Sequence, residues 1–176
     1  MEYKKTLNLP QTDFPMRAGL VQREPERLAK WYTDGLYEQI QKRRDGAERF
    51  LLHDGPPFAN GDVHIGTALN KILKDFILKY QTLRGKHVPY VPGWDCHGLP
   101  IEFKVTQQMR KDGNTDATPV TIRKACEEYA LGFIDTQREQ FKRLGVLGEW
   151  DNPYLTLNPA YEAEELRLFA DLVEKG

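Results

Sequence analysis

The most informative part of the sequence is FLLHDGPPFANGDVHIGTALNKILKDFILKY, residues 50–80. It opens with a short apolar run, Phe50-Leu51-Leu52, which the turn formers Gly55-Pro56-Pro57 end. Such a run indicates a buried strand, because a parallel strand covered on both faces loses the alternating pattern. After a loop of turn formers, apolar residues recur at three- and four-residue steps, which predicts a strong helix. The residues of this apolar face are Ile65, Ala68, Leu69, Ile72, Leu73, Phe76 and Tyr80.

A second strand is predicted after this helix. Gly85 ends the helix, and Val88-Pro89-Tyr90-Val91 forms another apolar run that stops at Pro92-Gly93. Strand, helix and strand in so short a stretch form a βαβ unit, whose two strands run parallel. The sequence therefore predicts an α/β fold, the first half of a doubly wound sheet. Two strands cannot complete such a sheet, so we expect the chain to be a piece of a longer protein.

The N-terminal segment is predicted to be an extended arm followed by a helix. Residues 1–22 are polar and interrupted by Pro10 and Pro15. Glu24-Pro25-Glu26 resembles a helix start, because proline preorganises the first turn and acids face the positive helix end. The apolar spacing then indicates a helix that ends near Gly46.

Three further helices are predicted in the second half of the chain. A short one covers residues 101–110 and ends at Asp112-Gly113-Asn114. Thr118-Pro119 is a cap followed by proline and opens a helix that runs to about Leu144. Asn158-Pro159 opens the last helix in the same way.

Composition indicates a protein of the cytoplasm with no membrane segment. The formal net charge is −1 and 29% of the residues are charged, so no global basic field points to nucleic acid. The two cysteines, Cys96 and Cys126, form neither a disulfide framework nor a zinc ligand array and suit a reducing compartment. No run of about 18 apolar residues occurs, and the N-terminus lacks the apolar core of a signal peptide.

Two loops at the carboxyl edge of the predicted sheet carry the candidate chemistry. His64, Gly66 and Thr67 open the helix that follows the first strand, where unpaired N–H groups and the helix dipole favour an anion. An imidazole and a hydroxyl on one face of the first turn can donate hydrogen bonds to phosphate oxygens. In the second loop, Asp95 offers a carboxylate for a ligand ammonium group, beside Trp94 as an apolar wall.

Residues 53–67 and 91–102 together resemble the first signature region of the class I aminoacyl-tRNA synthetases. Within this class, Pro-Pro-Phe-Ala-Asn-Gly before His-Ile-Gly, and Gly-Trp-Asp-Cys-His-Gly-Leu-Pro-Ile-Glu after it, are similar to the isoleucyl enzymes. Leucyl, valyl and methionyl enzymes differ around Cys96-His97-Gly98. The similarity runs from about residue 3 to the end of the chain.

The resemblance implies a Rossmann-like catalytic domain that activates isoleucine with ATP and transfers it to tRNA(Ile). It divides the chain into an N-terminal arm and helix, residues 1–46, and the N-terminal half of the catalytic domain, residues 47–176, ending before an editing insertion. The implied catalytic residues are His64 and Thr67. The implied ATP-binding residues are Asn60, His64, Gly66 and Thr67. The implied isoleucine-binding residues are Gly55, Pro56, Phe58, Gly93, Trp94 and Asp95.

One position departs from the family pattern. The fourth residue of the signature is usually histidine, and here it is Thr67, which can still donate one hydrogen bond but cannot become cationic. Losing that histidine would cost roughly 10²–10³ in rate if it stabilises the transition state. The family's Lys-Met-Ser-Lys-Ser loop does not occur in residues 1–176.

The resemblance also implies the cofactors and partners. They are ATP with Mg²⁺, isoleucine and tRNA(Ile), and the tRNA is expected to bind mainly through other domains. Zinc is expected only in segments of the family's proteins that residues 1–176 do not include. The protein is expected to be a monomer.

Three alternatives remain open at this stage. A truncated relative of the enzymes could bind nucleotide or a partner without turnover, which the Thr67 departure favours. A metal-dependent hydrolase would use His53, Asp54, His64, Asp95 and His97, although their spacing matches no known zinc pattern. Lys71 and Lys74 are most simply part of a solvated helix face, although Lys71 could add positive charge near the phosphates. Trp94 could be a core packing residue rather than a pocket wall.

Overall fold

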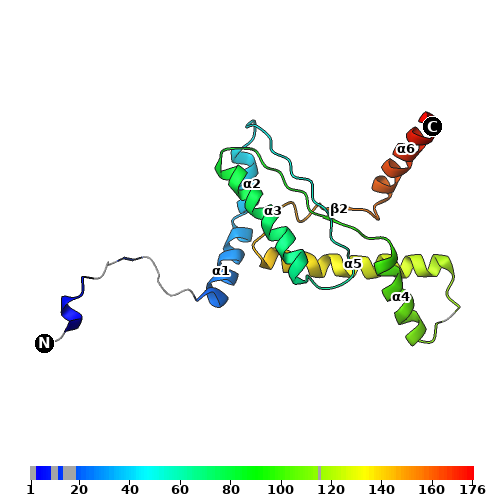
Figure 1. Cartoon of the computed structure of the whole chain (residues 1–176), viewed down its shortest axis with the longest axis horizontal. Coiled ribbons are helices and arrows are strands. Elements are labelled where there is room, and N and C mark those ends of the chain that lie inside the picture. Colours follow the sequence, from blue (N-terminus) through cyan, green and yellow to red (C-terminus); the bar gives the residue numbers. More distant parts are fainter. Residues whose placement is uncertain (1–2, 9–11, 14–18, 115) are drawn as a thin grey trace.

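The computed structural model describes residues 3–8, 12–13, 19–114 and 116–176 (Figure 1). The helices of this part of the chain are η1 (Tyr3–Thr6), α1 (Leu20–Thr33), α2 (Leu36–Arg43), α3 (Ile65–Leu83), α4 (Leu99–Lys111), α5 (Pro119–Arg143) and α6 (Pro159–Lys175). The strands are β1 (Gly93–Trp94) and β2 (Tyr154–Leu155). In the described residues no helix is long and apolar enough to cross a membrane.

The predicted helices of the second half are confirmed, and side-chain caps fix the starts of α5 and α6. The Thr118 hydroxyl accepts a hydrogen bond from Thr121 N at 3.2 Å, and α5 runs from Pro119 to Arg143. Asn158 Oδ1 accepts from Ala160 N at 2.9 Å at the start of α6. Each cap satisfies an N–H that the first turn leaves unpaired.

The N-terminal prediction is wrong in two respects. The helix begins at Leu20, so Pro25 lies inside α1 and not at its first turn. It also breaks before Leu36, where Gly35 adopts a φ of 61°, a left-handed conformation that glycine adopts without steric cost. Residues 3–6 form a 3₁₀ helix within the predicted arm. Pro10 and Pro15 of the predicted arm lie outside the described residues.

Three extended segments lie side by side in parallel, with residues 87–96 in the middle. On one side, Phe50 N donates to His87 O at 2.9 Å, and Asp95 N donates to Pro57 O at 2.9 Å. On the other side, β1 pairs with β2 in the register Gly93 to Tyr154. The β2 segment is a third parallel partner that the sequence did not reveal.

The two predicted strands are much shorter than expected. Residues 50–52 form no strand, the nearest pairing is a single bridge at Arg49, and Leu51 is 66% exposed. Residues 88–91 also form no strand, although Val88 and Tyr90 are buried as predicted for an apolar run. Pro89 interrupts residues 88–91, and because proline has no N–H it cannot donate to a ladder. Within the described residues, regular pairing is confined to β1 and β2, with isolated bridges at Arg49 and Phe58.

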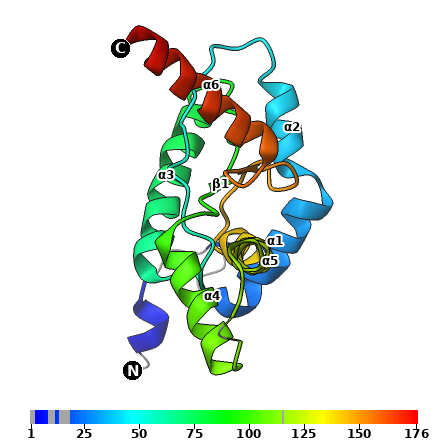
Figure 2. The same cartoon turned by 90° about the vertical axis from the view of Figure 1, so that its right-hand side faces the viewer.

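The core lies between the three extended segments and α5. Its largest side chains include Trp94, Tyr90, Phe141 and Ile134, each at most 2% exposed. Trp94 packs against Phe141 and Trp150, with ring centroids 6.5 and 6.2 Å apart. Helix α4 packs against α5 (Figures 1 and 2), and α6 stands away from the other helices in Figure 1.

Helix α3 buries a polar face and exposes its apolar face. Its buried residues are Lys71, Asp75 and Leu78, and its apolar residues Leu69 and Phe76 are 55% and 63% exposed. The helix itself was predicted correctly from its spacing. The side that it turns toward the rest of the described chain carries the ion-paired Lys71 and Asp75 together with Leu78.

Candidate active site

The first candidate cluster lies at the N-terminus of α3. His64 is the N-cap, and its Nδ1 accepts hydrogen bonds from Gly66 N at 3.1 Å and Thr67 N at 3.3 Å. Its Nε2 lies 2.9 Å from Thr67 Oγ1. Since Nδ1 accepts both bonds, we infer that the neutral ring carries its proton on Nε2, which then donates to Thr67. The imidazole and the hydroxyl therefore face each other, as the spacing predicted.

Gly66 makes room for this imidazole. A Cβ at position 66 would lie 3.0 Å from His64 Cε1 and 3.2 Å from His64 Nδ1. These separations are closer than ordinary contact, so a larger residue would push the ring out of its present position. Gly66 therefore permits the N-cap arrangement, besides its expected role next to a nucleotide.

The second candidate cluster joins residues 55–58 to residues 93–95. Asp95 N donates to Pro57 O, and Ala59 N donates to Asp95 O at 3.0 Å, which places Phe58 beside Asp95. Asp95 Oδ1 accepts from His97 N at 3.3 Å, and Phe58 is 45% exposed. Pairing of two loops far apart in the sequence thus brings the six expected isoleucine-binding positions into one region.

Gly93 and Trp94 in this cluster pack inward. Gly93 is buried under the ring of Tyr154. Trp94 is 0% exposed, and its Nε1 donates to Gln137 Oε1 at 2.9 Å. The structure therefore places the Trp94 side chain in the core, and its expected place on a pocket wall stays a prediction.

Glutamines of α5 hold the loop between the two clusters, and sequence reasoning missed them. Gln137 Nε2 donates to Phe58 O at 3.0 Å and to Gly61 O at 2.7 Å. Gln140 accepts from Val63 N and donates to Asp62 Oδ1, both at 2.7 Å. The sequence contained a signal for Gln137, because it follows Ile134 by three residues on the buried face of α5. A polar residue on a buried stripe needs partners.

Asn60 belongs to the same loop. Its backbone carbonyl accepts from the Tyr129 hydroxyl of α5 at 3.3 Å. In the described residues, no hydrogen bond or ion pair joins His64 directly to Asp95. The two candidate clusters are connected through residues 58–63, which α5 supports.

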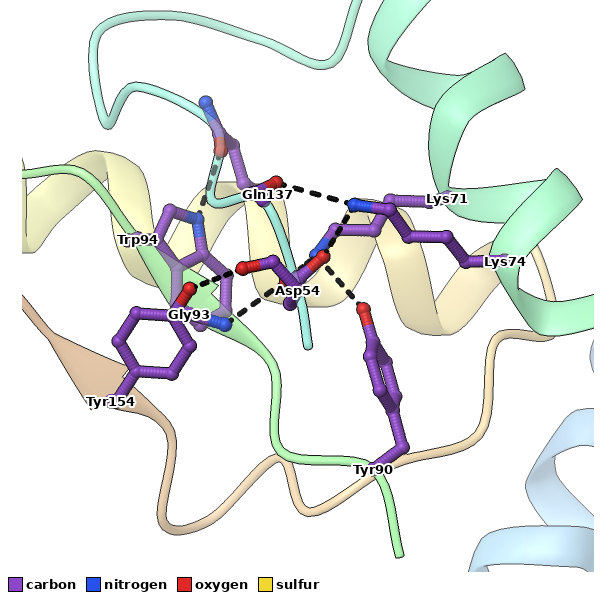
Figure 3. Close-up of polar contacts among 9 residues, drawn as sticks. Asp54, Lys71, Lys74, Tyr90, Gly93, Trp94, Gln137 and Tyr154 are labelled. Atoms are coloured by element: carbon purple, nitrogen blue, oxygen red, sulfur yellow. Dashed lines mark hydrogen bonds and ion pairs between the residues drawn. The ribbon is translucent and has the colours of Figure 1, made fainter. Parts of the chain in front are cut away.

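The buried carboxylate of Asp54 binds two lysines of α3, which corrects the solvated-face interpretation (Figure 3). Asp54 Oδ2 pairs with Lys71 Nζ, and Asp54 Oδ1 lies 2.8 Å from Lys74 Nζ. Lys71 is 1% exposed and also lies 3.2 Å from the Tyr90 hydroxyl. Gly93 N donates to the same carboxylate at 3.1 Å. We call Asp54, Lys71, Lys74, Tyr90 and Gly93 the Asp54 cluster.

The pKa shifts in the Asp54 cluster have opposite causes. Burial alone would raise the pKa of Asp54, but the nearby Lys71 and Lys74 ammonium groups hold that pKa below its usual value. Burial lowers the pKa of Lys71, and Asp54 opposes that shift. Burial also raises the pKa of Tyr90, so its hydroxyl stays protonated and can donate. The cluster is an ion pair network with one more cation than anions.

An open cavity of about 880 Å³ lies among α4, α5 and the start of α6. It is lined by residues that include Cys96, His97, Ile101, Cys126 and Glu162, and by neither His64 nor Asp95. His97 Nε2 lies 3.3 Å from Glu162 Oε1 at its edge. The cavity therefore begins just beyond the second candidate cluster.

The metal-dependent hydrolase hypothesis finds no support in this arrangement. Among the described residues, no three histidine, cysteine, aspartate or glutamate side chains come together as a potential metal site. Asp54, one of its five residues, is instead neutralised by two lysines.

Comparison with known proteins identifies the family. The family described as tRNA synthetases class I (I, L, M and V) matches residues 26–176. The isoleucine–tRNA ligase of Zymomonas mobilis is 60% identical over 168 residues, which are 94% of this chain and 18% of that protein. The isoleucine–tRNA ligases of Kosmotoga olearia and Thermotoga maritima are each 57% identical to this chain. Each match covers the whole of this chain and 19% of the length of the relative. The chain thus spans about a fifth of the length of these relatives.

A solved structure agrees with the fold. The chain superposes with a TM-score of 0.67 and 25% identity on the crystal structure of the ternary complex of Agrobacterium radiobacter K84 agnB2 LeuRS, tRNA and LeuAMS. The match covers 91% of this chain and 18% of that one. It confirms the predicted α/β fold as the first half of the doubly wound catalytic domain. With its fold, its signature loops and the match over residues 26–176, the chain belongs to the class I tRNA synthetases of the I, L, M and V group.

Proposed function

We propose that residues 1–176 supply the first half of the adenylate-forming site of an isoleucine–tRNA ligase. In this reaction a carboxylate oxygen of isoleucine bonds to the α-phosphorus of ATP, and pyrophosphate leaves with the electron pair of the broken P–O bond. The isoleucyl group then passes to tRNA(Ile). Relatives named isoleucine–tRNA ligase, at 53–60% identity along nearly the whole chain or all of it, support this proposal.

The observation that carries the proposal is the N-terminus of α3. The N-terminus of this helix attracts phosphate through its dipole and through the N–H groups of its first turn, two of which donate to His64 Nδ1 in this structure. His64 Nε2 and Thr67 Oγ1, 2.9 Å apart, are two side-chain donors at that end. Both can stabilise negative charge that builds on the phosphate oxygens as the new bond forms. We expect the His64 ring to turn away from Gly66 N and Thr67 N when phosphate takes its place on those amides.

The amino acid is expected at the second cluster. Asp95 provides the carboxylate for the isoleucine ammonium group, and exposed Phe58 lies beside it. Gly55 and Pro56 precede Phe58 on the same segment, which supports their expected place along the amino acid. Asn60 and Gly66, on the helix side, are proposed for the nucleotide. One methylene distinguishes isoleucine from the next smaller apolar amino acid by only about 1–3 kcal/mol of binding energy. The contacts of the pocket do not establish this choice, so specificity for isoleucine is part of the proposal.

A chimera tests the proposal directly. Residues 1–176 replace the equivalent N-terminal segment of the Thermotoga maritima isoleucine–tRNA ligase, and isoleucine-dependent exchange of pyrophosphate into ATP is measured. We expect exchange in the chimera and little in the 176-residue chain alone. His64→Ala should lower kcat by roughly 10²–10³ with little change in KM, since it removes a donor used mainly in the transition state.

Asp95→Asn is the companion variant for the amino acid side. It should chiefly raise the KM for isoleucine and leave the KM for ATP unchanged, because it removes only the charge that faces the ammonium group. An unchanged isoleucine KM would contradict the role of Asp95. A chimera that folds and binds ATP but shows no exchange would favour the alternative of a nucleotide-binding module without turnover.

The remaining parts of the proposal concern Mg²⁺, tRNA and location. Mg²⁺ would enter with the phosphates of ATP, and we assign it no protein ligand among the described residues. Contacts with tRNA(Ile) are expected mainly from other domains. We place the protein in the cytoplasm, because free Cys96 and Cys126 suit a reducing compartment.

A further inference from the structure

The Asp54 cluster ties α3 to the two extended segments that carry the proposed isoleucine-binding residues. Asp54 itself directly precedes Gly55, and its carboxylate holds two lysines of α3, the helix that begins after His64. The same carboxylate accepts from Gly93 N, two residues before Asp95. Tyr154 of β2 donates its hydroxyl to Asp54 O (Figure 3). One side chain therefore links both candidate clusters.

Charge neutralisation does not explain the second lysine. Lys71 alone would balance the buried carboxylate, and its ammonium is fully inside the protein. Lys74 adds a further positive charge, its side chain is 17% exposed, and its Nζ also donates to Gly55 O at 3.3 Å. It thus reaches from α3 to the backbone where isoleucine is expected.

We propose that Asp54 and Lys74 are positioning residues for adenylate formation, an inference that rests on the proposed function. The phosphate side of the site lies at the start of α3, and the amino acid side lies along residues 55–58 and 93–95. Reacting atoms must approach to roughly 3–3.5 Å before the bond forms. The Asp54 cluster sets that spacing, because it fixes α3 against both extended segments.

Helix α3 offers a matched control in a second ion pair with a buried carboxylate. Asp75 is 5% exposed, pairs with Lys79 Nζ at 2.6 Å and accepts from Leu147 N at 3.3 Å. Lys79 Nζ also donates to Gly145 O at 2.9 Å. This pair has the same chemistry as Asp54 with Lys74, including a lysine that reaches a backbone carbonyl. It ties α3 to residues 145–147 and not to either candidate cluster.

The test compares Lys74→Met with Lys79→Met in the chimera described above. Lys74→Met should lower kcat for isoleucine-dependent exchange by roughly 10²-fold, the effect of a misplacement of about 1 Å, with little change in either KM. Lys79→Met should keep the kcat of the unsubstituted chimera, although both variants lower the unfolding temperature. Lys74→Arg, which keeps a donor within reach of Asp54, should recover most of the lost kcat.

A double variant separates stability from positioning. Asp54→Asn leaves Lys71 buried without its partner and should unfold readily, whereas Asp54→Asn with Lys71→Met removes both charges and should fold more stably. The recovered protein should still have a low kcat. In the 176-residue chain, Lys74→Met should also speed hydrogen exchange at Gly66 N, which Lys79→Met should leave unchanged.

The outcomes are distinguishable. Equal kcat values for Lys74→Met and Lys79→Met, or a full recovery of kcat in the double variant, would overturn the positioning role while the proposed function stands. A rise in KM with unchanged kcat would also overturn it. Absence of isoleucine-dependent exchange in the unsubstituted chimera would overturn the proposed function together with this inference.

Discussion

Replacing Gly93 by alanine would place a Cβ against the ring of Tyr154. The nearest ring atoms, Cζ and Cε1, would lie 2.1 and 2.2 Å away, and ordinary contact begins only at 3.4 Å. The ring has little room to retreat. It stacks on His53 and on Tyr161, with centroids 5.6 and 6.1 Å apart, and its hydroxyl donates to Asp54 O. The alanine must therefore disturb the pairing of β1 with β2.

The expected loss of stability combines two effects. Overpacking a buried position costs about 1–3 kcal/mol, and losing the Tyr154 hydroxyl bond costs about 0.5–1.5 kcal/mol, so the total is about 1.5–4.5 kcal/mol. With a urea m value of about 2 kcal/mol per M, the unfolding midpoint should fall by about 1–2 M. Urea unfolding of the 176-residue chain, followed by circular dichroism, measures this shift.

The control for Gly93→Ala makes the same chemical change where there is space. A Cβ at Gly132, in α5, would meet nothing within 4 Å, so Gly132→Ala should stabilise the chain by about 0.5–1 kcal/mol. In a Tyr154→Ala background, Gly93→Ala should cost much less than in the native sequence. A loss below about 1 kcal/mol in the native sequence, or strictly additive losses in the double variant, would refute the steric argument.

Three further predictions concern charge, surface and catalysis. The pKa of Asp54 is lowered in the folded chain, so the stability that this carboxylate contributes is present above its ordinary pKa of 3.8 and is lost as the pH falls through the lowered pKa. The free energy of unfolding should therefore fall steeply below pH 3.8. In the double variant Asp54→Asn with Lys71→Met, the same pH dependence should be flatter. Leu69→Gln with Phe76→Gln should change the free energy of unfolding in urea by less than about 1 kcal/mol, because both side chains are mostly exposed. A large loss of stability would contradict the outward placement of that face. Thr67→His in the chimera should raise kcat for pyrophosphate exchange by at least roughly tenfold if this position stabilises the transition state, and an unchanged kcat would show that Thr67 serves equally well.

Much of the candidate site could be predicted because its signals are local. His64 bonds to residues two and three positions away, and the same is true of Thr118 and Asn158 at the starts of α5 and α6. Helix spacing and capping act over such distances, so the chain itself reveals them. The family resemblance rested on two such loops, residues 53–67 and 91–102, and the family match confirms it.

The partners of buried polar groups could not be predicted in this way. Asp54 meets Lys71 17 residues away and Tyr154 100 residues away, and Gln137 meets Phe58 79 residues away. The lysines were expected in solvent, because nothing in their neighbourhood on the chain indicates a carboxylate. The third parallel segment was missed because the strand Tyr154–Leu155 is too short to show a strand pattern in the sequence.

By itself, the sequence determined where α3, α5 and α6 form, which residues cap α5 and α6, and to which family the chain belongs. Only the tertiary structure decided which face of α3 turns inward, that two lysines share one buried carboxylate, and that Trp94 lies in the core. Local hydrogen bonds and side-chain spacing act within one or two helical turns and are fixed by neighbours on the chain. Burial and ion pairing instead depend on which distant segments meet, and this is settled only when the extended segments, α3 and α5 pack together.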